Sequence, residues 1–141
     1  MSATLVHASC VAIDGRAVLI GGASGRGKSD LALRLIDRGA TLVSDDYTNV
    51  AAHAGRLSAT APATIAGRIE MRGVGIVEME AVSEVAVCLY VDLDAEPERL
   101  LQPASRAIAG AEIPSVALSG LEASAPLKVE AALRLYGLPA R

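Results

Sequence analysis

Eight residues between positions 22 and 29 have the types and spacing of a phosphate-binding loop. They read Gly22-Ala23-Ser24-Gly25-Arg26-Gly27-Lys28-Ser29 and fit the pattern G-x-x-x-x-G-K-[ST]. Glycines let successive backbone N–H groups converge on an anion, and a helix that begins there adds partial positive charge. Lys28 is expected to reach the β- and γ-phosphates, and the Ser29 hydroxyl to hold Mg²⁺. The sequence therefore predicts that residues 22–29 bind a nucleoside triphosphate.

The segments on either side of this loop support the prediction. Ala17–Ile20 reads as a buried strand, and residues 30–38 read as a helix with Leu31, Leu35 and Ile36 on one side. The alternative is a glycine-rich turn that fits the pattern by accident, and it does not explain why strand, loop and helix follow in register. We expect the Lys28 side chain to face solvent until nucleotide binds.

Two adjacent acids, Asp45 and Asp46, follow the apolar run Thr41–Ser44. An apolar strand that ends in acidic residues is typical of a Walker-B element. Mg²⁺ on a triphosphate requires hard oxygen ligands, so a carboxylate from a neighbouring strand should join the Ser29 hydroxyl. Two acids allow one to contact the metal while the other faces the attacking hydroxyl. The alternative is a solvated strand end, which is disfavoured because the pair follows the phosphate loop and a short helix.

The remaining elements predict an α/β fold with a mixed β-sheet and flanking helices. Strands are expected over residues 5–13, 16–20, 40–43, 85–93 and 113–118, with short β pieces between 49 and 79. Asp14 and Gly15 predict a tight turn, and Gly39 is expected to end the first helix. Further helices are expected over residues 96–101, beginning near Pro97, and over 124–136. We expect one domain over residues 1–141.

Composition excludes several classes of protein. Of 141 residues, 52% are hydrophobic and 21% charged, which is incompatible with a disordered chain. The net charge of −3, without a Lys/Arg cluster, argues against a nucleic-acid partner. The apolar runs are too short to cross a bilayer and no signal peptide is apparent, so we expect no membrane association and a cytoplasmic location. Cys10 and Cys88 are isolated in apolar segments, which predicts buried, reduced thiols.

Three features, in this order, resemble the bacterial HPr kinase/phosphorylase family. His7 lies upstream of the phosphate loop as the family's histidine does, Gly22–Asp46 resembles the family's core, and Ile69–Ile76 resembles its signature, an acid followed by x-R-G-x-G-I. The resemblance implies a P-loop-containing, phosphoenolpyruvate carboxykinase-like fold. It also implies an ATP- and Mg²⁺-dependent kinase for a serine of HPr, the phosphocarrier protein of the sugar phosphotransferase system. Many members also run the reverse phosphorolysis, and we expect this chain to lack the N-terminal domain of longer members.

The resemblance implies roles for individual residues. Asp45 corresponds to the base that takes the serine proton, and His7 is expected to tune its carboxylate. Asp46 and Glu70 would complete the Mg²⁺ sphere together with Ser29. The predicted catalytic residues are therefore His7, Lys28, Asp45 and Arg99, the last as a charge stabiliser.

The signature block has its own expected features. Glu70 could be a surface charge on a strand, but its neighbour Arg72 favours a functional site. Gly73 and Gly75 permit close approach of the backbone to another group. The stretch 72–77 is apolar apart from Arg72, which predicts that a second subunit covers it; the resemblance implies a hexamer.

Two other functions fit the phosphate loop. One is a kinase for a small molecule, against which the chain has no Arg-rich lid segment after the core. The other is a regulatory module that binds ATP and signals through a partner without phosphoryl transfer. His7, Asp45 and Glu70 argue against the module, because binding alone needs no base.

Overall fold

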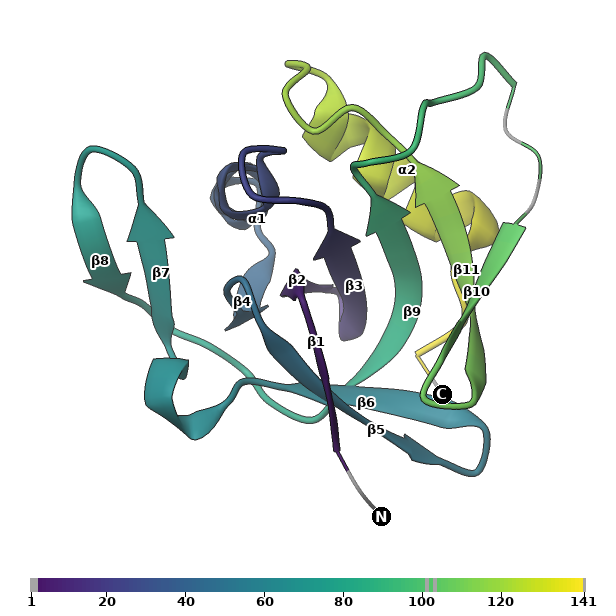
Figure 1. Cartoon of the computed structure of the whole chain (residues 1–141), viewed down its shortest axis with the longest axis horizontal. Helices are drawn as coiled ribbons and strands as arrows, with labels where there is room; N and C mark the ends of the chain where they lie inside the picture. Colours follow the sequence, from purple (N-terminus) through teal and green to yellow (C-terminus); the bar gives the residue numbers. More distant parts are fainter. Residues whose placement is uncertain (1–2, 101, 103, 141) are drawn as a thin grey trace.

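A curved mixed β-sheet organises the chain, and both α-helices pack against one of its faces (Figure 1). The computed structural model describes residues 3–100, 102 and 104–140. Nine strands form the sheet in the order β1-β5-β6-β9-β3-β2-β4, with β11 beside β9 and β10 beside β11. Their bounds are β1 Thr4–Val6, β2 Ala8–Ile13, β3 Arg16–Gly21, β4 Thr41–Ser44, β5 Thr48–His53, β6 Arg56–Thr60, β9 Val85–Asp92, β10 Ala104–Ile108 and β11 Ala111–Ala117.

A separate two-stranded hairpin stands beside this sheet. It consists of β7 (Arg68–Met71) and β8 (Gly75–Glu78), and lies on the far side of α1 (Lys28–Asp37) from α2 (Ala125–Tyr136) in Figure 1. A single 3₁₀ turn, Ala63–Ile65, precedes it. The predicted β pieces between residues 49 and 79 are thus β5, β6, β7 and β8.

The centre of the sheet places the phosphate loop between parallel and antiparallel neighbours. β3 pairs antiparallel with β2 and parallel with β9, and β9 pairs parallel with β11. The prediction of a mixed sheet with flanking helices is confirmed. The turn between β2 and β3 is the predicted one: Asp14 and Gly15 have φ values of 51° and 75°, the left-handed pair that a type I′ hairpin turn requires.

Two apolar cores lie on opposite faces of the sheet, because side chains alternate along each strand. Leu31 and Leu35 of α1 and Val129 of α2 pack on one face against Val18 and other side chains of β3, β4 and β9. The other face buries a second set that includes members of β5, β6 and β11: Leu19, Val50, Leu57, Val87 and Ile113. Both cores consist mainly of aliphatic side chains, in a chain without Phe and Trp, and the second core also contains Tyr90.

Two irregularities near the site are not visible in the sequence. The strand expected over residues 5–13 is broken at His7: β1 pairs with β5, whereas β2 pairs with β3 and β4. Between β2 and β4 the register shifts, because Cys10 faces Ser44 while Val11 faces Leu42. Val43 is therefore the extra residue of a β-bulge, a device that re-aims the side chains that follow it.

One predicted element is wrong. Residues 96–100, the described part of the helix expected over 96–101, form an irregular exposed segment. Pro97 supplied a helix-start signal, but Leu100 is 77% exposed and has no apolar surface to pack on. A short helix without tertiary packing is marginal in water.

The other expectations about individual elements agree with the structure. Cys10 and Cys88 are buried free thiols, and the Gly39 N–H bonds the Ile36 carbonyl at the end of α1. Within the described residues, no helix has the length and apolar character that crossing a membrane requires.

Candidate active site

The phosphate loop connects β3 to α1 and is closed by its own lysine. Lys28 Nζ donates to the Gly22 carbonyl at 2.7 Å and lies 3.7 Å from Asp46 Oδ1. The Lys28 side chain is only 5% exposed, so the expectation that it faces solvent in the absence of nucleotide is wrong. The carbonyl and the carboxylate together hold the ammonium inside the site, because a buried cation requires such partners.

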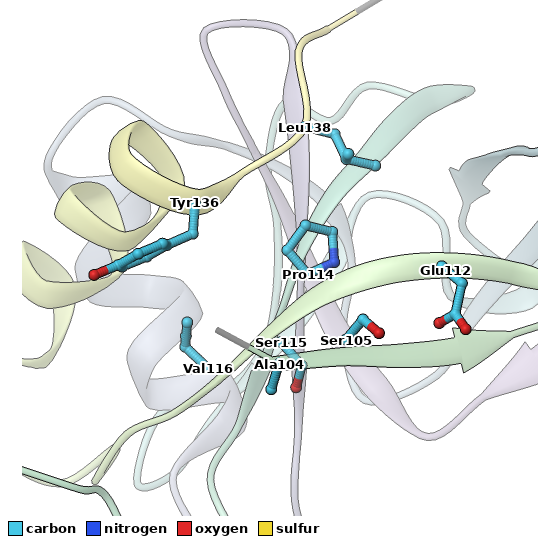
Figure 2. Close-up of a pocket in the computed structure, with 8 residues that line it drawn as sticks. All are labelled: Ala104, Ser105, Glu112, Pro114, Ser115, Val116, Tyr136 and Leu138. Carbon is cyan, nitrogen blue, oxygen red and sulfur yellow. The ribbon is translucent and has the colours of Figure 1, made fainter. Parts of the chain in front are cut away.

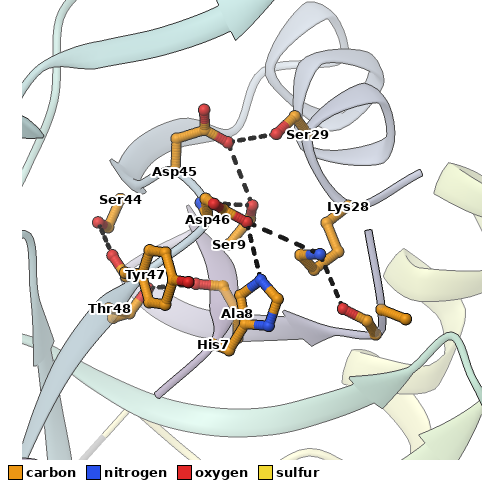
Figure 3. A network of polar contacts seen from close by, with 12 residues as sticks. His7, Ala8, Ser9, Lys28, Ser29, Ser44, Asp45, Asp46, Tyr47 and Thr48 are labelled. Carbon is orange, nitrogen blue, oxygen red and sulfur yellow. Dashed lines mark hydrogen bonds and ion pairs between the residues drawn. The ribbon is translucent and has the colours of Figure 1, made fainter. Parts of the chain in front are cut away.

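Asp45 is the buried carboxylate of the site and is held from three sides. The Ser29 hydroxyl donates to its Oδ1 at 2.5 Å and the Ser9 hydroxyl at 3.2 Å (Figure 3). The Glu70 N–H donates to its Oδ2 at 3.0 Å. The three donors come from α1, β2 and β7. Asp45 therefore ties the phosphate loop, the main sheet and the hairpin together at one point.

Asp46 is half-exposed and turned toward a different set of partners. Its Oδ1 lies 3.0 Å from His7 Nε2, and its N–H donates to the Ser9 hydroxyl at 3.0 Å (Figure 3). The φ of Asp46 is 68°, a left-handed conformation that is uncommon outside glycine. This conformation points two consecutive carboxylates at different partners. His7 is stacked on Tyr47, with ring centroids 4.8 Å apart.

Lys28, Ser29 and the two aspartates line a cavity of about 540 Å³, whereas His7 and Ser9 are not among its lining residues. One wall is the phosphate loop with the two aspartates, and the other carries Glu70, Arg72 and Val74 of the β7–β8 hairpin. The lining residues are Ser24, Gly25, Gly27, Lys28, Ser29, Asp30, Leu33, Asp45, Asp46, Glu70, Met71, Arg72, Val74 and Leu121. The predicted phosphate-binding, acidic and signature residues thus converge on one volume.

The remaining predicted residues have other positions. Arg99 does not line the cavity and lies in the exposed segment 94–100. Arg26 is directed away from the loop's interior and pairs with Asp94 at 3.3 Å. A Cβ on Gly73 or Gly75 would meet no atom of the chain within 4 Å, so no contact within the chain requires a glycine at either position. Their φ values of 86° and 122° place them in the left-handed region that the hairpin turn requires.

Sequence reasoning missed several residues that shape the site. Ser9 is fully buried and bonds both aspartates, and a lone hydroxyl between His7 and Cys10 was the only sign of it. Asp94 accepts a hydrogen bond from the Ala23 N–H at 3.0 Å. Its signal was position, because it follows β9, the strand parallel to the one that enters the phosphate loop. Leu121 lines the cavity from a segment far away in the sequence.

The donor set fits a cation that a nucleotide carries. Among the described residues, no three His, Cys, Asp or Glu side chains converge as a metal cage. Instead, the Ser29 hydroxyl and the four carboxylates of Asp30, Asp45, Asp46 and Glu70 are spread over the wall of one cavity. Mg²⁺ usually takes one or two carboxylates from the protein and its other ligands from phosphates and water. Hydroxyl and carboxylate oxygens without a closed cage are therefore suitable for it.

The nearby thiol takes no part in this chemistry. Burial raises the pKa of the Cys10 thiol far above its usual range, so it stays protonated and unreactive. A second cavity, of about 270 Å³, lies between Tyr136 at the end of α2 and the β10–β11 hairpin (Figure 2). Glu112 is the charged residue among its described lining side chains, and none of the predicted site residues borders it.

Known proteins with similar sequences all point to one family. Residues 1–88 match the HPr serine kinase C-terminal domain. The HPr kinase/phosphorylase of Clostridium kluyveri is 43% identical over 79 residues, which are 56% of this chain and 26% of that protein. That of Chlorobium chlorochromatii is 39% identical over 127 residues, or 79% of this chain and 38% of that protein. The chain thus spans only about a quarter to two-fifths of the length of these relatives.

A solved structure supports the same assignment at the level of the fold. The structure of the Hpr(Ser) kinase/phosphatase from Coxiella burnetii superimposes with a TM-score of 0.80 at 28% sequence identity, covering 93% of this chain and 88% of that one. The fold, the order of the motifs and the matched residues agree. The chain belongs to the family of the HPr serine kinase C-terminal domain.

Proposed function

We propose that the chain is the catalytic unit of an ATP-dependent kinase that phosphorylates a serine of HPr. The observation that carries the proposal is the convergence of Lys28, Asp45 and Glu70 on one cavity beside the phosphate loop. Binding of Mg-ATP needs a carboxylate for the metal, whereas only phosphoryl transfer needs a further carboxylate that takes a proton. The family membership and the names of the relatives, HPr kinase/phosphorylase, support the same substrate.

The phosphate loop and Lys28 are proposed to bind the nucleotide. The loop's N–H groups and the start of α1 favour the phosphates, and the Lys28 ammonium exchanges its Gly22 carbonyl partner for phosphate oxygens. Ser29, Asp46 and Glu70 are the proposed ligands of Mg²⁺, which would neutralise charge on the transferring phosphoryl group when bound. Phosphoryl transfer passes through a loose transition state, so positioning and charge stabilisation account for most of the catalysis.

Asp45 is proposed to take the proton of the substrate's serine hydroxyl. Its three hydrogen bonds fix the carboxylate in one position, and late removal of the proton needs only a weak, well-placed base. In the reverse reaction with inorganic phosphate, the same carboxyl group would return the proton. His7 acts on Asp45 only indirectly, because its Nε2 bonds the carboxylate of Asp46 and not that of Asp45.

One observation favours the opposite division of the two aspartates. Asp45, not Asp46, accepts the hydrogen bond from the Ser29 hydroxyl, the proposed metal ligand. Asp46 lies beside His7 and Lys28, near the expected position of the transferred phosphoryl group. In this second arrangement Asp45 belongs to the metal and Asp46 takes the proton. Separate variants of the two residues distinguish the arrangements and are described in the Discussion.

The exposed hairpin supports a proposal about assembly. Val74 and Ile76 are 75% and 72% exposed in the single chain, and contiguous exposed apolar side chains mark interaction surfaces. We propose that a second copy of the chain covers the hairpin in a symmetric oligomer, a hexamer by resemblance, and that HPr binds near the junction.

The decisive experiment is direct transfer. The chain is incubated with γ-labelled ATP, Mg²⁺ and purified HPr, and the labelled residue is mapped by mass spectrometry. Label on a serine of HPr is the expected result. Label that reaches a small acceptor but not HPr, or ATP binding with no transfer to any acceptor, would contradict the proposal.

A further inference from the structure

We propose that Leu121 forms the surface on which the nucleoside part of the nucleotide packs. This makes the segment 118–124 a specificity element of the site. The inference rests on the proposed function, since it concerns the same nucleotide. It extends that function from the phosphates, which every nucleotide shares, to the part that distinguishes a nucleotide from inorganic polyphosphate.

The first argument for this proposal is the position of Leu121. It lines the same cavity as Ser24, Gly27 and Lys28. Its Cδ2 lies so close to Gly27 that a Cβ on that glycine would approach it to 2.9 Å. The apolar side chain of Leu121 therefore lies directly beside the phosphate loop, with no other residue between the two.

The backbone that presents Leu121 is fixed on both sides. Arg34 of α1 donates to the carbonyls of both Gly120 and Glu122, and Asp30 pairs with the same guanidinium at 2.9 Å. Gly120 is buried against the phosphate loop, where a Cβ would come within 2.8 Å of the Arg26 carbonyl oxygen. A segment anchored in this way presents its side chain in one place, and a ligand loses little free energy in ordering it.

The second argument for this proposal is the exposure of Leu121. Its neighbours in the segment are packed or bonded, yet the side chain itself is 70% exposed. A leucine cannot bind phosphate, and a large apolar side chain at the rim of a polar cavity suits the flat apolar face of a base or a ribose. None of the three tyrosines lines this cavity, so an aliphatic contact takes the place of aromatic stacking.

The other exposed apolar residue of the cavity lies on the opposite wall. Val74 belongs to the β7–β8 hairpin, which lies across α1 from the segment that leads into α2 (Figure 1). The hairpin wall carries Glu70, and the Glu70 N–H bonds Asp45, so the proposed base and the acceptor hydroxyl lie next to the hairpin. The nucleoside therefore extends from the phosphate loop toward Leu121, away from the entering substrate.

Binding of two Mg²⁺-loaded ligands, ATP and inorganic tripolyphosphate, tests the inference by calorimetry on the full chain. Leu121→Ala should raise the Kd for ATP about fivefold, the effect of losing part of one leucine's apolar contact, and leave the Kd for tripolyphosphate unchanged. Leu121→Met should restore most of the affinity for ATP. Leu135→Ala is the matched control, because Leu135 is 67% exposed and lies outside the cavity; it should change neither Kd.

An unchanged Kd for ATP in Leu121→Ala would overturn the inference. Equal losses for ATP and tripolyphosphate would also overturn it, because Leu121 would then act only through the phosphate loop. In both cases wild-type protein still binds ATP, and the proposed function stands. Failure of wild-type protein to bind ATP would instead overturn the proposed function, and this inference with it.

Discussion

The two walls of the cavity are built in different ways. The wall with the phosphate loop grows out of the centre of the main sheet, where Lys28 is 5% exposed and Asp45 is buried. The other wall is the two-stranded β7–β8 hairpin, which pairs with no other strand among the described residues. Ile69 fixes it in the core, and the Glu70 N–H bonds Asp45.

This difference indicates that the wall with the phosphate loop binds the phosphates and that the hairpin wall completes the site. Phosphate binding needs fixed N–H groups, and the central strands provide them. A two-stranded hairpin with few buried contacts opens at a lower free energy than a central strand does. The hairpin wall can therefore move at a lower free-energy cost than the phosphate loop, to which it is linked through Asp45. The predictions below test this separation, beginning with the wall that should matter most.

Lys28→Ala should have the largest effect. Removing the buried ammonium should lower phosphoryl transfer to HPr by about a thousandfold, the upper range for a single charge-stabilising group. The free energy of unfolding should fall by only about 1 kcal/mol, because one hydrogen bond is lost at the edge of a cavity. Labelled transfer and thermal melting measure the two effects. Lys128→Ala on α2 is the control, and transfer by Lys28→Ala near the wild-type rate would remove the loop from the mechanism.

Asp45→Asn and Asp46→Asn should separate proton transfer from metal binding. Asp45→Asn is expected to bind Mg-ATP normally and to lose transfer by about a hundredfold or more, because the amide keeps the shape but cannot accept the proton. Asp46→Asn should mainly raise the Mg²⁺ concentration needed for half-maximal rate. Mg²⁺ titrations of transfer and of ATP binding measure both. The reverse pattern would establish the second arrangement, in which Asp45 serves the metal.

Glu70→Gln should have a smaller effect, because it changes the hairpin wall alone. We expect about a tenfold increase in the Mg²⁺ requirement, with ATP binding at saturating Mg²⁺ preserved. Glu78→Gln is the matched control on β8, since Glu78 is exposed and its one ion pair within the described part of the chain is with Arg68, at 3.7 Å. Equal effects of the two substitutions would mean that Glu70 acts through the charge of the hairpin and not as a ligand.

The double variant Val74→Ser/Ile76→Ser should have the smallest effect on the isolated fold. Both side chains are exposed in the single chain, so the stability of the monomer should change by no more than about 0.5 kcal/mol. The oligomer should nevertheless dissociate toward the 14.4 kDa chain in light scattering at micromolar concentration. Wild-type protein that is monomeric and fully active would remove the oligomer from the mechanism.

Much of the phosphate-binding wall could be predicted from the sequence because its signals are local. The loop, the strand before it and the helix after it are contiguous, and the turn at Asp14 and Gly15 is determined by two residues. The break at His7 could not be predicted, since residues 5–13 have uniform strand character and only pairing with different partners divides them. The helix predicted over residues 96–101 is absent from its described part, residues 96–100, for a similar reason. Pro97 favours a helix start, but the segment has no apolar surface to pack on.

The site residues show a similar division. Residue types and spacing identified Lys28 and the two aspartates as members of one site, and the resemblance to the family added Glu70. They did not show that Lys28 is buried, because that depends on a carbonyl and a carboxylate that the fold places beside it. Nor could they show Ser9 or Leu121, whose contributions arise from tertiary contacts between distant segments.

The bulge at Val43 affects the direction of the two carboxylates that follow β4. Leu42 and Val43 are buried in different cores on opposite faces of the sheet, and Val43 is the extra residue between the pairs Val11–Leu42 and Cys10–Ser44. Deleting Val43 would leave a regular ladder in which Leu42 still faces Val11 and Ser44 still faces Cys10. The residues of the site would be unchanged, but the local bend and twist that the bulge gives the strand before Asp45 and Asp46 would be lost. The shape of β4, and not only its sequence, therefore determines where the two carboxylates point.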